Sequence, residues 1–148
     1  MKKLSIALRF GLVTSAVLIA YFLVLALVDK HTNPAFSFVN AIITGLGIYE
    51  AIRLHKLENP SAFSYGEGFK TGIITGFVAT LIFTIFFLFY ATEINNTFIS
   101  DLILSIHSGL NADIGMVAFV VAVMGFATTV VATLTVMQLF KNTRNIVK

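Results

Sequence analysis

The basic residues of this chain fall into three clusters. Nine of the ten Lys and Arg residues lie before, midway between or after four apolar stretches that carry almost no charge, and Lys30 is the exception. The clusters are Lys2, Lys3 and Arg9; Arg53, Lys56 and Lys70; and Lys141, Arg144 and Lys148. Lys and Arg accumulate on the cytoplasmic flanks of membrane helices. The pattern therefore predicts four membrane spans, with the N-terminus and the C-terminus in the cytoplasm.

The composition is that of a chain surrounded by lipid. Hydrophobic residues make up 57% of the 148 residues and charged residues 11%, whereas soluble domains are about one quarter charged. The mean hydropathy is +0.93. The lipid bilayer is thus the first expected partner. The net charge of +3 is explained by orientation and by anionic headgroups, so no nucleic-acid partner is expected.

The residues that usually carry chemistry are scarce. The chain has no cysteine, which excludes disulfides, thiolate metal sites and thiol nucleophiles. His31, His55 and His107 are far apart and lack ligand spacing, so no metal site and no cofactor are expected. No ionisable side chain lies centrally in any apolar stretch, although such a residue usually marks a proton relay or an ion path. We therefore expect no catalytic residue and no enzymatic activity.

The predicted fold is all-α: one polytopic membrane domain over residues 1–148, with four transmembrane helices in a compact bundle. The expected spans are about 6–28, 34–56, 65–90 and 114–140. The apolar run from Phe10 to Val28 exceeds the roughly 7–15 residues of a signal-peptide core, so we expect it to persist as the first helix.

Local signals mark the helix ends. Asn33-Pro34 suits the start of the second span, because Asn caps free amides and Pro tolerates the first helical position. Ser64 and Glu67 have the spacing of a capping box at the start of the third span. Asn111 or Asp113 is expected to cap the fourth span.

A short amphipathic helix is predicted over about 97–109, between the third and fourth spans. Its apolar residues recur at steps of three and four: Phe98, Ile99, Leu102, Ile103, Ile106 and Leu110. It is too short to cross a bilayer, so we place it on the outer leaflet surface or across the mouth of the bundle. A lid over apolar helix ends is favoured over a docking surface for a partner.

Small residues predict where the helices pack. Membrane helices associate through close contacts between small side chains. The third span carries Gly68, Gly72 and Gly76, and the fourth carries Gly115, Ala118, Ala122 and Gly125. We expect the two sets to meet inside one chain, with an intermolecular contact as the alternative. The opposite face of the third span carries Phe77, Phe83, Phe86, Phe87, Phe89 and Tyr90, and we expect this face to contact lipid or the groove of a partner.

Glu67 and Lys70 form the only compact charged pair close to a glycine groove. They are a candidate polar site at the inner mouth of the bundle. The alternative explanation assigns Glu67 to the capping box and Lys70 to the positive-inside anchor, and it requires no ligand.

The segment Phe63-Ser-Tyr65-Gly66-Glu-Gly68-Phe69-Lys70-Thr-Gly72 opens the third of four spans. In this segment and in its span order the chain resembles the DUF4199 family, small integral membrane proteins found largely in Bacteroidota-type bacteria. The resemblance implies a four-helix protein of the bacterial inner membrane and no known activity. Tyr65 to Gly72 is either a functional cytoplasmic patch or, as we favour, a helix cap followed by a packing groove.

Two functions remain open after this. The first is a structural or accessory subunit that binds another membrane protein, or a second copy of itself, through small-residue helix faces. The alternative is a small transporter or a lipid- or metabolite-binding membrane protein.

Overall fold

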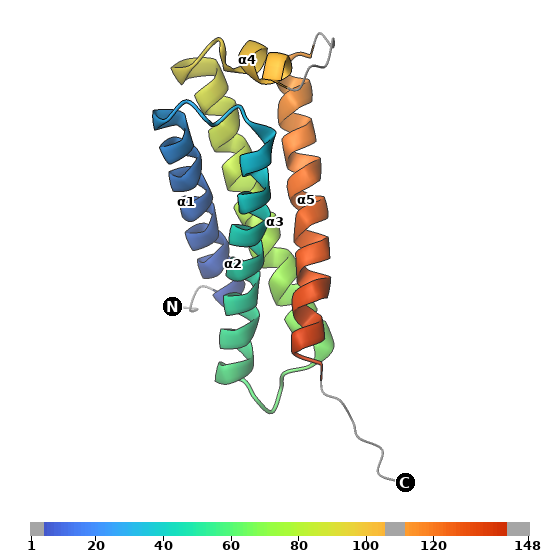
Figure 1. Ribbon diagram of the computed structural model, residues 1–148. Coiled ribbons are helices and arrows are strands. Elements are labelled where there is room, and N and C mark those ends of the chain that lie inside the picture. Colours follow the sequence, from blue (N-terminus) through green and yellow to red (C-terminus); the bar gives the residue numbers. More distant parts are fainter. Residues whose placement is uncertain (1–4, 106–111, 142–148) are drawn as a thin grey trace.

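The computed structural model describes residues 5–105 and 112–141. Within these ranges the elements are helical: α1 (Ile6–Leu27), a 3₁₀ turn η1 (Pro34–Phe36), α2 (Ser37–Glu58), α3 (Tyr65–Phe89), a π-helical turn η2 (Tyr90–Ile94), α4 (Phe98–Ser105) and α5 (Ile114–Leu139) (Figure 1). Four of the described helices are long and apolar enough to cross a membrane. The prediction of an all-α membrane protein with four spans is confirmed.

The helix starts follow from the capping residues. α1, α3 and α5 begin at the predicted residues, whereas α2 begins at Ser37 after the turn η1. The Asn33 side chain accepts a hydrogen bond from the amide of Ala35 at 3.0 Å. The Ser64 hydroxyl oxygen accepts one from the amide of Glu67 at 3.3 Å. Asp113 precedes α5 without a side-chain cap, and Asn111 lies outside the described residues.

The tilt of α3 organises the bundle. With η2 it forms a segment of 30 residues, which spans about 45 Å and exceeds the ~30 Å hydrocarbon core, so it must tilt. Figure 1 shows α3 lying beside α5 at the end that carries the α2–α3 connection and beside α1 at the end that carries α4. We call these the loop end and the α4 end. α3 and α5 therefore separate toward the α4 end.

An aromatic core fills the α4 end. Its buried members come from every helix except α2: Phe22 of α1, Phe87 of α3, Tyr90 and Ala91 of η2, Phe98 of α4 and Ala118 of α5. The Phe22 ring meets Tyr90 edge-on, with centroids 4.9 Å apart. The expectation that the aromatic face of α3 contacts lipid is therefore wrong for Phe87 and Tyr90. Phe77 and Phe89 are exposed on the bundle surface, where contact with lipid or a partner stays a prediction.

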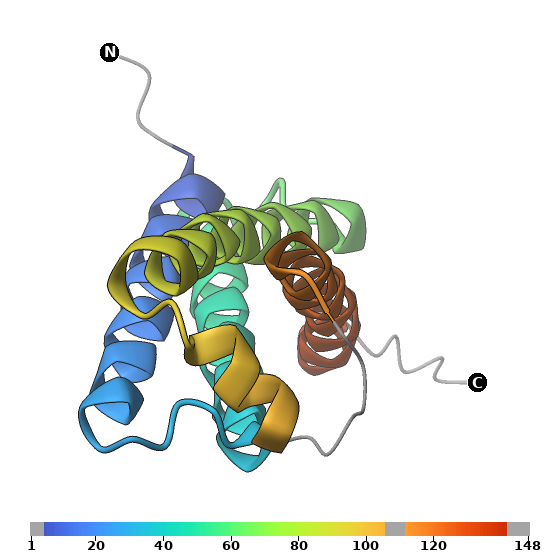
Figure 2. The same ribbon diagram turned by 90° about the horizontal axis from the view of Figure 1, so that it is seen from above.

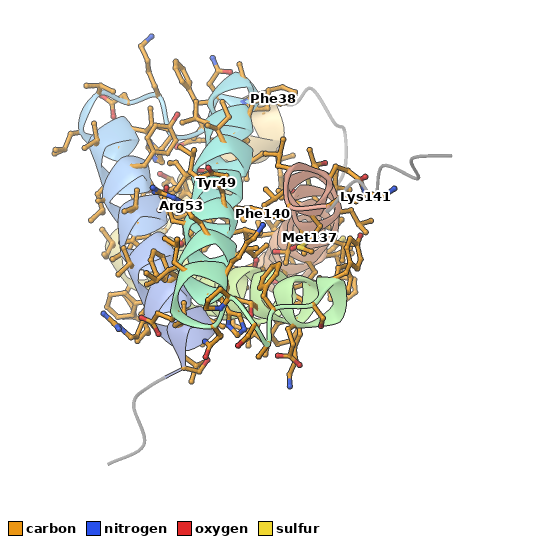
Figure 3. All side chains as sticks on the ribbon, turned by 90° about the horizontal axis from the view of Figure 1, so that it is seen from below. Phe38, Tyr49, Arg53, Met137, Phe140 and Lys141 are labelled. Carbon is orange, nitrogen blue, oxygen red and sulfur yellow. The ribbon has the colours of Figure 1, made fainter. Side chains whose placement is uncertain are left out.

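A second core lies at the loop end. Ile48 and Ile52 of α2 pack there against Val136 and Met137 of α5. Tyr49, Met137 and Phe140, labelled in Figure 3, come together at this end, and the Tyr49 and Phe140 ring centroids are 5.6 Å apart. Glu50 and Arg53 form an ion pair on the surface of α2, at 3.2 Å.

α4 lies across its end of the bundle (Figure 2). It is anchored by Phe98, which is 1% exposed and packs on the rings of Phe22, Phe87 and Tyr90. Asp101 and Leu104 point away from the bundle and are exposed. Of the two predicted placements, the one across the bundle mouth is observed. The predicted residues 106–109 of this helix lie outside the described part of the chain.

Candidate functional site

Three glycines of α3 lie directly against α5. A Cβ added to Gly72 would lie 2.6 Å from Thr133 Cγ2, and one added to Gly68 would lie 2.8 Å from Met137 Sδ. A Cβ on Gly76 would lie 2.9 Å from the Cβ of Thr129. Contacts between carbon atoms are optimal at about 3.5–4.0 Å, so a side chain at Gly72 or Gly76 would overlap a buried threonine, and one at Gly68 would displace the end of the Met137 side chain. The structure thus brings the Gly68–Gly72–Gly76 groove against α5 within one chain.

The predicted small residues of α5 lie in different environments. Gly125 faces Thr80 of α3, where an added Cβ would lie 2.9 Å from the Thr80 hydroxyl oxygen. Ala118 belongs to the aromatic core, and Ala122 is partly buried. Gly115 is exposed and an added Cβ would meet only the Asp113 carboxylate. Because α3 leans toward α1 at this end, Gly115 takes no part in the α3–α5 contact.

Two further packing glycines were not predicted from the sequence. A Cβ on Gly11 of α1 would lie 2.8 Å from the Val78 side chain of α3, and one on Gly47 of α2 would overlap Thr14 of α1. Each has a buried small residue four positions away: Ala7 and Ser15 flank Gly11 on α1, and Ala51 follows Gly47 on α2. Gly45, by contrast, has no atom within 4 Å of an added Cβ.

Glu67 and Lys70 lie in an open cleft of about 640 Å³ at the loop end. The cleft is also lined by Arg9, His55 and Glu58, so acidic and basic groups are mixed. Glu67 and Lys70 are both exposed, and no ion pair joins them in the described part of the chain. Within the cleft, His55 Nδ1 lies 3.3 Å from the Thr71 hydroxyl and links α2 to α3. The arrangement is that of a solvated polar surface.

A better enclosed cavity lies at the α4 end, where α3 and α5 separate. It has a volume of about 210 Å³ and lies between α1, α2, α3 and α5, beneath α4. Its wall is mainly apolar and aromatic, including Phe22, Phe83, Phe87 and Phe98. Most polar side chains of the wall come from around the start of α2 and the connection before it: His31, Asn33, Ser37, Asn40 and Thr44. Tyr21 of α1, Thr80 of α3 and Thr128 of α5 add hydroxyl groups. Such a wall is typical of small-molecule sites.

The end of α1 directs His31 into this cavity. The amide of Asp29 bonds to the Ala26 carbonyl at 3.2 Å and that of Lys30 to the Leu25 carbonyl at 2.9 Å. These bonds form a Schellman turn, with Asp29 at the left-handed position (φ 54°). The Tyr21 hydroxyl donates to the Phe36 carbonyl at 3.1 Å and ties α1 to η1. The connection is thereby folded back over the bundle.

The His31 ring is held by aromatic contacts and not by hydrogen bonds. It stacks on Phe98 at 5.0 Å and meets Phe22 edge-on at 5.7 Å. Both ring nitrogens are buried and have no hydrogen-bond partner among the described residues. The same is true of Asn40 Oδ1. Buried polar atoms normally have hydrogen-bond partners. Because these three atoms have none among the described residues, they are free to bind a ligand or ordered water.

Burial lowers the pKa of His31 from its ordinary value, because the charged imidazolium loses its hydration. The carboxylates of Asp29 and Asp101 act in the opposite direction but with smaller effect. The ring is therefore neutral at pH 7, with one N–H donor and one acceptor nitrogen.

Only a faint signal in the sequence points to this cavity. Asn40 stands alone as an amide inside an otherwise apolar stretch, and burying it without a partner is unfavourable. His31 looks like an ordinary residue of a membrane-surface connection. Among the described residues no group of three or more His, Asp or Glu side chains lies close enough to hold a metal ion.

The comparison with protein families matches residues 9–142 to a protein of unknown function, DUF4199. The chain belongs to the DUF4199 family. The match covers all four spans and both polar regions described above, and the family description assigns no activity to them. Neither the curated proteins nor the solved structures gave a match to the chain.

Proposed function

We propose that this DUF4199 protein is a membrane-embedded binding protein that holds a small molecule in the cavity at the α4 end. The observation that carries the proposal is the pairing of a partly open, largely apolar cavity with buried polar atoms of His31 and Asn40 that have no hydrogen-bond partner among the described residues. An apolar wall with a few convergent polar groups is how small-molecule sites are usually built. The role proposed is binding without catalysis.

The size of the cavity suits a small group. An apolar cavity of about 150 Å³ binds benzene, and the present one is larger, at about 210 Å³. Its position within an apolar bundle favours a compound that partitions into the membrane over a water-soluble metabolite.

The test is to purify the protein from its membranes in mild detergent and identify bound compounds by mass spectrometry. We expect one compound to copurify with the wild type and to be absent from Asn40→Leu, which replaces the buried amide with an apolar side chain. Asn96→Leu, an exposed amide on the connection to α4, is the matched control. A compound that is retained equally in all three proteins would refute the proposal.

An accessory-subunit role is the second candidate. The small residues Gly68, Gly72, Gly76 and Gly125 are occupied within the chain, which removes them as docking faces for another protein. Gly45 is different, since its outward face is open. A partner helix that packs on Gly45 would support this second function.

We further propose that the protein resides in the bacterial inner membrane with the loop end in the cytoplasm. The support is the distribution of charge. The described basic residues Arg9, Arg53, Lys56, Lys70 and Lys141 all belong to helix ends at the loop end. At the α4 end lie Asp29, Glu93, Asp101 and Asp113, with Lys30 as the one basic residue described there. This asymmetry is the one expected for a positive cytoplasmic side.

A further inference from the structure

We propose that the bound compound is a neutral, single-chain amphiphile, with a hydroxyl head between His31 and Asn40 and an alkyl chain in the groove between α2 and α5. This inference rests on the proposed function, because it names the class of molecule that the cavity takes.

The groove continues the cavity toward the lipid. It has a volume of about 590 Å³ and an almost wholly apolar lining, to which α2 contributes Ala41, Ile42 and Gly45. Ala41, Met124 and Thr128 line both the cavity and the groove. A molecule with its head in the cavity therefore has a path for its chain along the bundle surface, beside the surrounding lipid.

The length of the groove suits one alkyl chain. On α5 it extends from Met124 to Val136, which is about 18 Å at ~1.5 Å per residue. This length is close to one leaflet of a hydrocarbon core about 30 Å thick. Gly45 leaves the groove open where the chain would pass, with nothing within 4 Å of an added Cβ. A partner helix in this groove would leave the polar atoms of His31 and Asn40 unpaired, whereas an amphiphile satisfies them.

The cavity favours an uncharged head. Its lining residues include no Asp, Glu, Lys or Arg, so a carboxylate, phosphate or ammonium group would be buried there without an opposite charge. Such burial is strongly unfavourable. The neutral His31 ring offers one N–H donor and one acceptor, and Asn40 Oδ1 is an acceptor. A hydroxyl matches both residues, since it can donate to Asn40 Oδ1 while it accepts from the His31 N–H.

Three probes with one oleyl chain and different heads test the proposal: oleyl alcohol, oleic acid and oleylamine. Their binding to the purified full-length protein is measured by native mass spectrometry in detergent. We expect oleyl alcohol to bind with one-to-one stoichiometry and at least about tenfold more tightly than the acid or the amine, a difference of about 1.4 kcal/mol. Asn40→Leu should weaken binding of the alcohol by at least about tenfold.

A variant in the groove distinguishes the contribution of the alkyl chain to binding from that of the hydroxyl head. Gly45→Leu fills the groove and should weaken oleyl alcohol at least about tenfold, while benzyl alcohol, which has no long chain, binds as to the wild type. Ala127→Leu, at an exposed position of the same groove, is the second variant should Gly45→Leu fail to fold.

Each contrary result has a distinct meaning. Equal affinity for the three oleyl probes would overturn the neutral head while leaving the proposed function intact. Unchanged affinity in both groove variants would overturn the placement of the chain. Loss of a copurifying membrane protein from Gly45→Leu, with no alcohol binding to the wild type, would show a partner helix in the groove. The proposed function itself fails if no probe binds and no membrane compound copurifies, or if a copurifying compound is retained equally in Asn40→Leu and Asn96→Leu.

Discussion

Replacing Gly72 with alanine tests how closely α3 packs on α5. The added Cβ would lie 2.6 Å from Cγ2 and 2.9 Å from the hydroxyl oxygen of Thr133, and 3.1 Å from Cδ1 of Ile52. Thr133 is β-branched and fully buried, so it has little freedom to move aside. Overpacking of this kind typically costs about 1–3 kcal/mol.

Gly45→Ala is the matched control, because it makes the same chemical change in an open position. Both variants gain about 1 kcal/mol in helix propensity, so this contribution cancels when they are compared. We therefore expect the free energy of unfolding of Gly72→Ala to be about 1–3 kcal/mol below that of Gly45→Ala. The measurement is an SDS titration in mixed micelles, followed by circular dichroism since the chain has no Trp. Equal values for the two variants would refute the packing described here.

Three further predictions concern charge and orientation. Because burial lowers the pKa of His31, the stability that the neutral ring contributes is present above pH 6.5 and is lost as the pH falls through the folded-state pKa. Between pH 7.5 and 5, the wild type should therefore lose more stability than His31→Gln. Asp29, Asp101 and Tyr90 are the other titratable groups near the ring. A membrane-impermeant thiol reagent should label Asn95→Cys but not Asn59→Cys in intact cells, and the reverse would invert the topology. Replacing Glu67 and Lys70 together with Gln should leave ligand binding unchanged in the mass-spectrometric assay, and loss of the ligand from a folded double variant would move the site to the loop end.

The four spans could be predicted from the sequence, because apolar stretches and the basic clusters between them can be read directly along the chain. The α3–α5 contact could also be predicted, because Gly68, Gly72 and Gly76 recur every four residues and so share one helix face. Which side of α3 faces away from the bundle could not be predicted from the sequence. Phe87 and Phe89 both belong to the aromatic outer half of this helix, but at about 100° per residue they face nearly opposite sides, so Phe87 is buried in the aromatic core while Phe89 is exposed.

The cavity escaped prediction for two physical reasons. The turn that brings His31 inward has Asp29 at its left-handed position, where Gly or Asn would have been the usual signal. The cavity also depends on the separation of α3 and α5, which is a property of how three helices cross and is not encoded in any one of them. Asn40 was the single local clue, as a lone amide in an apolar stretch.

The most direct test of the account is a crystal structure of the wild-type protein grown from a monoolein mesophase. Monoolein is itself a neutral single-chain amphiphile with hydroxyl groups. We predict its head in the cavity, with an oxygen about 2.7–3.2 Å from a His31 ring nitrogen and from the Asn40 side chain, and its chain beside Gly45. A cavity that holds only water, or one that the surrounding side chains have closed, would contradict the account.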